Sequence, residues 1–330
     1  MLFEDWPSSG LVGIARMAAE SDLLEAKRSV EYFELPARRY IGRCSGVRMP
    51  FEWTINPYRG CEFGCRYCYA RYTHEFMELR DPLLFERKIY AKEWNAAEFG
   101  AELDKIPIGD TIALGTATDP YQPAERRFGI TRAMLEVFAS RRGFRLWITT
   151  KSDLVTRDLD LLKQSARGNI VGVNVSITTL DTKLARLLEP MATRPDLRLA
   201  AIQKLSAAGI RTGVLCCPIL PLLNDSEENL NAVAAAAARA GAKHFGGNVL
   251  FLKPCAQAVF FPFLEQHFPR LVRRYRERYG EGAFLQGPYV HAVQERVNLV
   301  RDRNGLNGRR TVDELPEFWP PEQMGLFEAG

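Results

Sequence analysis

The stretch NPYRGCEFGCRYCYARYTHEF, residues 56–76, places Cys61, Cys65 and Cys68 within eight positions. The chain of 330 residues has seven cysteines, an odd number that argues against a framework of disulfide bonds. Gly60 and Gly64 allow the backbone to fold tightly around a bound group. Thiolate ligands favour zinc or iron–sulfur clusters. The stretch therefore predicts a metal-binding loop.

Two kinds of metal site fit three clustered cysteines. Structural zinc sites use four protein ligands, and His74 is available to complete a set of three cysteines and one histidine. A cubane iron–sulfur cluster is normally held by four cysteines, so three would leave one iron open to a ligand that takes part in chemistry. One compact triplet favours the cluster, because zinc ribbons usually join two separated pairs. Zinc and unliganded thiols stay open as alternatives.

The composition is that of an ordinary globular protein, with 46% hydrophobic and 25% charged residues. No apolar run approaches the roughly 18 residues that suggest a membrane span. The opening segment MLFEDWPSSG is acidic and contains a proline, unlike a signal or transit peptide. We expect a cytoplasmic monomer with no membrane association.

Short, almost continuously apolar segments recur along the chain, as expected of strands buried on both faces of a parallel sheet. They span residues 51–58, 111–119, 144–151, 169–177, 209–218 and 244–252. Helices are expected at 11–27, 131–143, 156–168 and 225–241, the last with Asp225 as its N-cap. Alternating strands and helices predict parallel βα units, arranged as a doubly wound sheet or as a complete or partial barrel.

The chain divides into three expected parts: a lead-in segment at 1–50, a core at 51–264 and a basic helical C-terminal extension at 265–330. The extension is rich in arginine at 270–280 and again at 301–310. A solvated helix face and a surface that contacts phosphates are both consistent with this local excess of positive charge.

The spacing C-x3-C-x2-C after the first core strand, with Tyr67 directly before the third cysteine, resembles the signature of the radical S-adenosylmethionine superfamily. The context NPYRGC…YCYAR and the segments TDPYQPAE at 118–125 and TTKSDLVTRDLDLL at 149–162 resemble the branch related to spore photoproduct lyase. The similarity runs from about residue 50 to residue 254. It implies an α/β fold, a partial (β/α)6 TIM-type barrel, in agreement with the six expected strands.

The resemblance implies that Cys61, Cys65 and Cys68 hold a [4Fe–4S] cluster whose remaining iron binds S-adenosylmethionine. It also implies a one-electron donor similar to flavodoxin or ferredoxin. Reduction would cleave S-adenosylmethionine to methionine and a 5′-deoxyadenosyl radical, which abstracts a hydrogen atom from a substrate. The tasks left to the protein are positioning and protection from water.

Polar residues at successive strand ends are candidates for binding S-adenosylmethionine. By resemblance, Tyr67 packs near the adenine, and Thr118 and Asp119 lie near the methionyl amino group, which needs hydrogen-bond acceptors. Lys151 could hold the carboxylate, and Ser176 could hydrogen-bond the same ligand. Convergence of polar residues at the ends of parallel strands is how a barrel forms a site. Core packing of Tyr67 and an ordinary Asp-Pro turn at Asp119 are the alternatives.

One position departs from the family. Spore photoproduct lyase has a hydrogen-donating cysteine in the loop after the second strand, and the matching residue here is Thr116. A hydroxyl group holds its hydrogen too strongly to replace a thiol, so reversal of a thymine dimer by the same route is not expected. Tyr69, Cys217 and Cys255 are the candidate catalytic residues. Because side chains alternate along a strand, one of Cys216 and Cys217 should face inward.

The substrate stays open at this point. Nucleic acid is the leading candidate, because a partial barrel has a lateral opening, the related lyase acts on DNA, and the C-terminal arginines are able to contact phosphates. A lyase-like repair reaction and a transferase reaction both fit, and a protein or a small molecule is the alternative substrate. A non-catalytic interaction module that binds zinc is a competing class of function.

Overall fold

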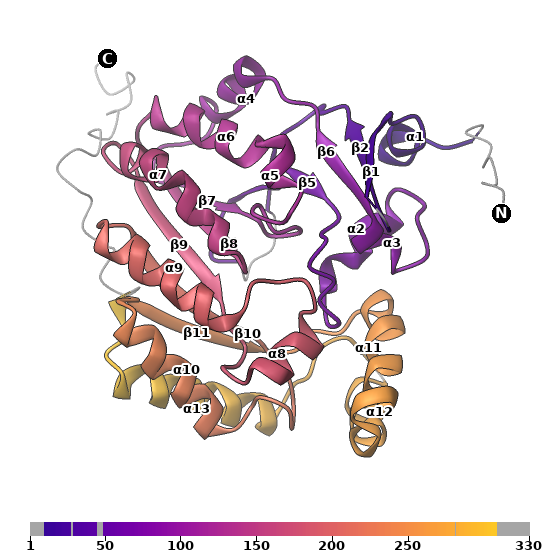
Figure 1. The fold of residues 1–330 in the computed structure, drawn as a ribbon, viewed down its shortest axis with the longest axis vertical. Helices are drawn as coiled ribbons and strands as arrows, with labels where there is room; N and C mark the ends of the chain where they lie inside the picture. The colour runs from indigo at the N-terminus through magenta and orange to yellow at the C-terminus, as the bar shows by residue number, and fades with distance from the viewer. Residues whose placement is uncertain (1–9, 28, 45–48, 281, 309–330) are drawn as a thin grey trace, which may run out of the picture.

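The computed structural model describes residues 10–27, 29–44, 49–280 and 282–308. The strands of its main sheet are β3 (Ile41–Arg43), β4 (Trp53–Ile55), β7 (Thr111–Leu114), β8 (Arg145–Thr150), β9 (Ile170–Ser176), β10 (Arg211–Ile219) and β11 (His244–Val249). Their order across the sheet is β11-β10-β9-β8-β7-β4-β3 (Figure 1). All neighbours pair in parallel except β3, which joins β4 antiparallel at one edge.

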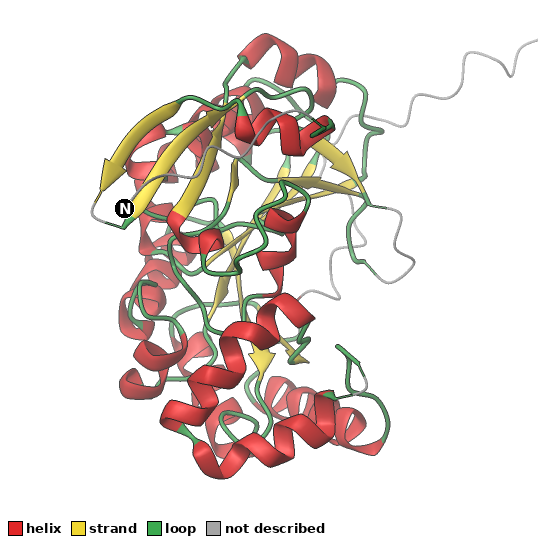
Figure 2. Ribbon diagram, turned by 90° about the vertical axis from the view of Figure 1, so that its right-hand side faces the viewer, coloured by secondary structure: helices red, strands yellow, loops and turns green. Residues whose placement is uncertain are grey.

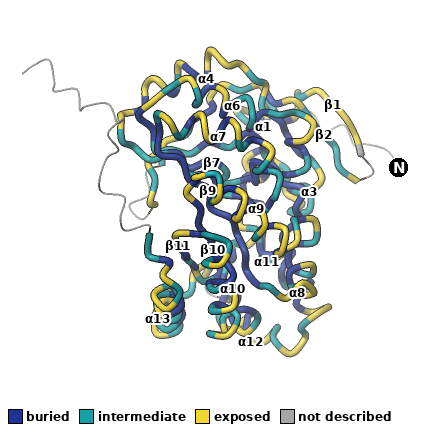
Figure 3. The backbone as a smooth tube through the Cα atoms, turned by 60° about the vertical axis from the view of Figure 1, so that its left-hand side comes forward, coloured by how far each residue is buried: buried dark blue, intermediate teal, exposed yellow. Residues whose placement is uncertain are grey.

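The six parallel strands are the six that the sequence pattern predicts, and the expected partial (β/α)6 barrel is confirmed. All seven residues of the central strand β9 are buried, as expected of a parallel strand covered on both faces. Figure 3 shows strands of the main sheet largely buried and exposed residues along the helices around it. The barrel is not closed, because β3 and β11 form two separate edges of the sheet.

Helices follow the parallel strands and cover their outer face (Figure 1). They are α4 (Ala96–Leu103), α5 (Glu125–Phe128), α6 (Ile130–Ala139), the 3₁₀ helix η2 (Asp153–Asp158), α7 (Leu159–Ser165), α8 (Thr182–Leu188), α9 (Pro195–Ala207) and α10 (Glu227–Arg239). The N-cap of α10 is Ser226, whose hydroxyl accepts from the N–H of Asn229. The sequence predicts Asp225 as the N-cap, which is one position too early. The carboxylate of Asp225 does not cap the helix and instead accepts a hydrogen bond from the hydroxyl of Tyr289.

A second, smaller sheet lies beside the barrel (Figure 2). Its strands, in spatial order, are β1 (Leu23–Lys27), β2 (Val30–Leu35), β6 (Lys88–Lys92) and β5 (Tyr58–Arg59). Between β5 and β6 the chain forms η1 (Tyr69–Arg71), α2 (Tyr72–Glu75) and α3 (Leu84–Arg87). The helix expected at 11–27 is only partly correct. Helix α1 spans Gly13–Ala19, and the following residues form β1 because β2 supplies their backbone hydrogen bonds.

The C-terminal helices pack into two different hydrophobic cores. They are α11 (Pro254–His267), η3 (Pro269–Leu271), α12 (Val272–Tyr279) and α13 (Pro288–Arg303). Val293, Val297 and Val300 of α13 belong to the core of the barrel, whereas Phe260 of α11 and Tyr275 of α12 pack with the cysteine-rich segment. The division at residue 265 stays a prediction, and residues 309–330 of the expected extension lie outside the described part. None of the helices described is long and apolar enough to cross a membrane.

Two glycines make room for large side chains inside the barrel. A Cβ atom on Gly213 would lie 1.9 Å from Nε2 of His244, and one on Gly172 would lie 2.2 Å from the ring of Trp147. The same Nε2 of His244 lies 2.5 Å from Oδ1 of Asn174, and the His244 ring packs edge-on against Trp147. Strands β8 to β11 therefore share one closely packed layer of aromatic and polar side chains.

We expect Gly213→Ala to lower the free energy of unfolding by about 1–3 kcal/mol, the typical cost of overpacking a filled interior. The new methyl group has to displace the His244 ring, which is hydrogen-bonded to Asn174. Urea denaturation followed by tryptophan fluorescence measures the difference. Gly246→Ala is the matched control, because its Cβ would lie 3.7 Å from the nearest atom, at ordinary contact distance. Equal stability of the two variants would contradict this description of the interior.

Candidate active site

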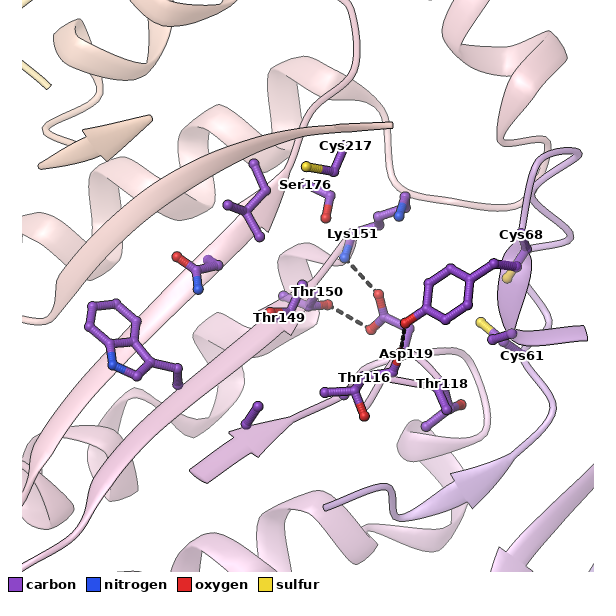
Figure 4. Close-up of a pocket in the computed structure, with 18 of the residues that line it drawn as sticks. Cys61, Cys68, Thr116, Thr118, Asp119, Thr149, Thr150, Lys151, Ser176 and Cys217 are labelled. Carbon is purple, nitrogen blue, oxygen red and sulfur yellow. Dashed lines mark hydrogen bonds between the residues drawn. The ribbon is translucent and has the colours of Figure 1, made fainter. Parts of the chain in front are cut away.

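The carboxyl ends of the parallel strands and the cysteine loop, residues 60–68, enclose a cavity of about 460 Å³. Its wall includes most of the residues singled out from the sequence (Figure 4). These are Cys61, Cys65, Cys68, Tyr69, Thr118, Asp119, Lys151, Ser176 and Cys217. The structure therefore brings together residues that lie more than 150 positions apart in the chain. Tyr67 and Cys255 are the two candidates that do not line the cavity.

The start of the cysteine loop packs directly on the chain that leads into β6. Gly60 has φ +85°, and a Cβ atom there would lie 2.7 Å from the carbonyl oxygen of Lys88 and 2.8 Å from that of Phe85. The backbone N–H of Cys61 donates to the same carbonyl of Phe85 at 2.9 Å. The left-handed backbone conformation at position 60 and the two nearby carbonyl groups both exclude any residue with a side chain.

Gln122 holds the cysteine loop from the side of β7. Its amide nitrogen donates to the carbonyl oxygen of Gly60 at 3.0 Å and to the hydroxyl of Thr118 at 2.9 Å. Its amide oxygen accepts from the backbone N–H of Glu62 at 2.9 Å. The hydroxyl of Thr118 donates to the carbonyl of Gly60 at 2.6 Å. Thr118 therefore supports the loop with its side chain, and its expected contact with the methionyl amino group stays a prediction.

The three loop thiols lie in surroundings that disfavour negative charge. Burial raises the pKa of Cys61 well above its usual value, that of Cys65 to about 12, and that of Cys68 in the same direction. Lys151 opposes the rise at Cys65, and Arg71 opposes it at Cys68. Three thiolates at this place need more positive charge than these side chains supply. A bound metal cluster provides such charge, so this donor set fits an iron–sulfur cluster.

The alternative zinc site lacks its fourth ligand at this cavity. His74 is buried in α2, where Nε2 lies 3.0 Å from the carbonyl oxygen of Lys88 and the ring packs on Phe85 and Tyr90. It does not line the cavity. Burial lowers the pKa of His74 to about 4. Across the residues that the structure describes, no three or more His, Cys, Asp and Glu side chains are placed to hold a single metal ion.

Asp119 is a fixed carboxylate at the carboxyl end of β7. It accepts from the hydroxyl of Thr150 at 2.7 Å and from the backbone N–H groups of Lys151 at 2.6 Å and Tyr121 at 2.9 Å. Burial raises the pKa of Asp119, while these hydrogen bonds and the ammonium of Lys151 lower it. Figure 4 shows its carboxylate held in this way at the cavity wall.

Lys151 supplies the opposite charge. Burial is the largest single influence and lowers the pKa of its ammonium, but Cys65, Glu189 and Asp119 together raise it by more, so the net shift is upward. The side chain is therefore charged at neutral pH, and within the described residues it forms no ion pair. Ser176, at the end of the next strand, adds a hydroxyl to the same wall. A carboxylate and an ammonium side by side complement the two charges of an amino acid.

Tyr67 belongs to a buried network behind the cavity wall. Its hydroxyl donates to Glu189, whose other carboxylate oxygen lies 2.5 Å from Nη2 of Arg198. Arg198 also donates to the backbone carbonyl of Ser176 at 2.7 Å. The side chains of Glu189 and Arg198 are 1% and 2% exposed, so this is a fully buried ion pair. The network joins the cysteine loop to the end of β9.

Cys217 faces the cavity, whereas Cys216 points into the core with its thiol 3.5 Å from the carbonyl oxygen of Thr178. This is the alternation expected along β10. Figure 4 shows Cys217 across the cavity from Cys61 and Cys68. Burial raises the pKa of the Cys217 thiol, although the backbone N–H of Asn248 and the ammonium of Lys151 oppose the rise.

The other two candidate catalytic residues differ in their placement. The hydroxyl of Tyr69, in the cavity wall, donates to the backbone carbonyl of Thr116. Cys255 lies in the first turn of α11 rather than in a loop, and its thiol interacts with Glu75 outside the cavity. The geometry thus favours Tyr69 and Cys217 over Cys255.

Four residues that shape the site were not identified from the sequence. Gln122 and Thr150 lie inside segments 118–125 and 149–162, so the family resemblance marks the right segments but not these side chains. Glu189 and Arg198 have no motif around them. Glu189 and Arg198 have opposite charges and lie nine positions apart, on either side of a turn. This spacing indicates an ion pair only once the positions of the two flanking helices are known.

We expect Arg198→Met to lower the free energy of unfolding by about 3–5 kcal/mol, because it leaves the carboxylate of Glu189 buried without its partner. The double variant Glu189→Leu/Arg198→Met should recover a large part of this loss. Urea denaturation of the metal-free chain measures both. A double variant as unstable as the single one would show that the two charges are not coupled.

The comparisons with known proteins show which family the chain belongs to. The sequence model of the Radical SAM superfamily matches residues 55–233. An uncharacterized protein, Rv2578c of Mycobacterium tuberculosis, is 38% identical over 286 residues, which cover 86% of this chain and 84% of that protein.

Solved structures of spore photoproduct lyase have the same fold. A tyrosine-to-phenylalanine variant superposes with a TM-score of 0.65 at 18% identity, covering 92% of this chain and 86% of the lyase. The lyase complexed with dinucleoside spore photoproduct gives a TM-score of 0.55 at 20% identity, over 72% of this chain and 66% of that chain, just under two thirds of its length. From the family match and the similarity to Rv2578c, this chain belongs to the radical S-adenosylmethionine superfamily.

Proposed function

We propose that this protein is an enzyme that cleaves S-adenosylmethionine reductively and uses the resulting 5′-deoxyadenosyl radical to abstract a hydrogen atom from a nucleic-acid substrate. The observation that carries the proposal is the cavity in which three thiols, a fixed carboxylate and a charged ammonium meet. A [4Fe–4S] cluster on Cys61, Cys65 and Cys68 would pass one electron to S-adenosylmethionine for this cleavage. A flavodoxin- or ferredoxin-like donor would reduce the cluster beforehand.

The chain's own residues provide the binding charges for S-adenosylmethionine. The carboxylate of Asp119 is held by Thr150 and by two backbone N–H groups, so it is oriented before the ligand arrives. It suits the methionyl ammonium, and the ammonium of Lys151 suits the methionyl carboxylate. Ser176 adds a hydrogen-bonding group to the same wall. Pre-oriented charges of this kind cost little reorganisation when the ligand binds.

Cys217 is the proposed donor of a hydrogen atom to the substrate radical. Its S–H bond breaks homolytically, the hydrogen atom forms the new C–H bond, and a thiyl radical remains. The thiyl radical returns to the thiol by taking one electron from the one-electron donor and one proton from solvent. Thr116 is not proposed for this part, because a hydroxyl group holds its hydrogen too strongly. Its hydroxyl instead bonds with Thr54 and accepts from Nδ2 of Asn56 at 3.1 Å.

A basic groove on the N-terminal side supports the choice of nucleic acid. Arg38, Arg39, Arg43 and Lys105 line it together with the ring of Trp53. None of these four cations forms an ion pair within the described ranges, and Arg43 lies over the Trp53 ring at 5.9 Å. Exposed cations beside an aromatic ring are typical of surfaces that follow a phosphate backbone. The fold is also that of a lyase whose structure contains a dinucleoside.

The nearest carboxylate in this groove does not neutralise it through a side-chain ion pair. The Glu102 carboxylate accepts from the backbone N–H of Tyr40 at 3.0 Å and of Ile41 at 2.9 Å. By contrast, two of the C-terminal arginines first expected to contact phosphates already have carboxylate partners on the surface. Arg276 pairs with Glu265 at 2.8 Å, and Arg273 lies 3.6 Å from Glu277. We therefore place the phosphate contacts in the groove.

Alanine at Cys61, Cys65 or Cys68 should remove bound iron and reduce the formation of 5′-deoxyadenosine to the level seen without protein. Each change removes one of the three thiolates that hold the cluster. Anaerobic reconstitution with iron and sulfide, followed by chromatography of the dithionite-reduced reaction, measures both. Cys44→Ala is the control, since this free thiol lies outside the cavity wall. A triple Cys→Ala variant that still forms 5′-deoxyadenosine would contradict the proposal.

In deuterium oxide, the protein should transfer deuterium to a nucleoside of a single-stranded oligonucleotide, because the thiol of Cys217 exchanges its hydrogen with solvent. Cys217→Ala should abolish this transfer, and Cys216→Ala should preserve it, since Cys216 faces the core. Mass spectrometry of the digested oligonucleotide measures the deuterium. Transfer that persists in Cys217→Ala would exclude this donor, and its absence in the unmodified protein would count against nucleic acid as the substrate.

A further inference from the structure

Five aromatic rings form a continuous, partly exposed strip that begins at the cavity. The strip consists of Tyr69, Tyr72, Phe76, Phe251 and Phe284, with Lys253 beside them, and Tyr69 is also part of the cavity wall.

 The Nζ atom of Lys253 lies 3.5 Å from the ring centroid of Tyr72. The strip therefore runs from the site of chemistry onto the surface of the molecule.

The rings of the strip are arranged for stacking. Phe251 and Phe284 are nearly parallel, with centroids 4.1 Å apart and an angle of 14° between their planes. Tyr69 lies 5.9 Å from Phe251 and 6.4 Å from Tyr72, and the two tyrosine rings are 22° from parallel. The backbone N–H of Leu252 donates to the carbonyl of Ala283 at 2.9 Å, which fixes the two phenylalanine segments beside each other.

Three of these aromatic side chains are exposed although burial would stabilise them. Phe284 is 67% exposed, Phe76 is 58% exposed and Tyr69 is 40% exposed. Scattered exposed apolar residues are normal, but a contiguous group of aromatic rings marks a surface for binding. Large aromatic faces with one cation among them suit a flat, negatively charged ligand.

Continuity with the cavity limits what such a ligand can be. A cavity of about 460 Å³ lies in the lower half of the range for ligand pockets, so S-adenosylmethionine and one reacting group fill it. If the substrate is a polymer, its segments on either side of the reacting group then have to lie outside the cavity, on the surface of the protein. Tyr69 is the residue that the cavity and the strip share.

We infer that the strip is a stacking platform for unpaired bases of a single-stranded nucleic acid, next to the nucleotide that enters the cavity. This inference rests on the proposed function, because it takes nucleic acid to be the substrate. Bases of any sequence stack on aromatic side chains, and Lys253 is placed to meet a phosphate of the same strand. The part of the strip beyond Tyr69 therefore determines how the strand is held and does not take part in the chemistry.

The test is the binding of fluorescein-labelled oligothymidylate to the complete protein, measured by fluorescence anisotropy. Phe284→Leu removes the outer stacking face and keeps an apolar side chain, so binding should weaken roughly 5- to 100-fold. Phe284→Tyr keeps a ring and should bind as the unmodified protein does. Leu299→Ala is the control for loss of an exposed apolar side chain, since Leu299 is 47% exposed on α13.

Two further measurements separate stacking from charge. An abasic oligonucleotide of the same length should bind equally to the unmodified protein and to Phe284→Leu, because it has phosphates and no bases. Lys253→Gln should reduce the slope of log Kobs against log salt concentration by about 0.7, the value for one phosphate of a single strand.

Each outcome points to one part of the account. Equal binding of oligothymidylate by Phe284→Leu and the unmodified protein would overturn the platform and leave the proposed substrate standing. Failure of the unmodified protein to bind any oligonucleotide would overturn both. Slower reduction by flavodoxin in Phe284→Leu, with oligonucleotide binding unchanged, would make the strip a docking surface for the electron donor and would also overturn the platform.

Discussion

The structure depends on holding three thiols together at the end of a parallel sheet, two of them buried and Cys68 partly exposed. Burial disfavours their ionised form, and a metal-binding thiolate has to be ionised, so the surroundings must supply positive charge. Lys151 and Arg71 supply part of it, and a bound cluster would supply the rest. The Glu189–Arg198 pair lies directly behind, with Tyr67 linking it to the cysteine loop. Charge balance in a region of low dielectric thus connects the loop to the barrel.

The two sheets hold this loop from opposite sides. The small sheet fixes its beginning, where Gly60 and Cys61 pack against the chain entering β6. The barrel fixes its middle through Gln122 and its far side through Arg198. The aromatic strip continues from the cavity wall at Tyr69 and offers a surface on which a strand could continue, whereas the basic groove is a separate surface that shares no lining residue with the cavity.

The sequence predicted the six parallel strands because each is a short apolar run between helical periods, and that pattern depends only on burial. It also predicted the cavity residues that occur at strand ends. It did not predict Glu189, Arg198 or Gln122 as parts of the site, because their roles come from contacts between distant segments. Residues 11–27 show the same limit: the pairing of β1 with β2 overrides the local preference for helix. The fold was therefore more predictable than the network that supports the site.

The central claim is that the three thiols hold a cluster with one position left for S-adenosylmethionine. Electron paramagnetic resonance of the anaerobically reconstituted, dithionite-reduced protein tests it most directly, with and without S-adenosylmethionine and alongside metal analysis. The account predicts about four irons per chain and a signal whose g values change when S-adenosylmethionine binds. Stoichiometric zinc without iron, or an iron–sulfur signal that S-adenosylmethionine leaves unchanged, would contradict it.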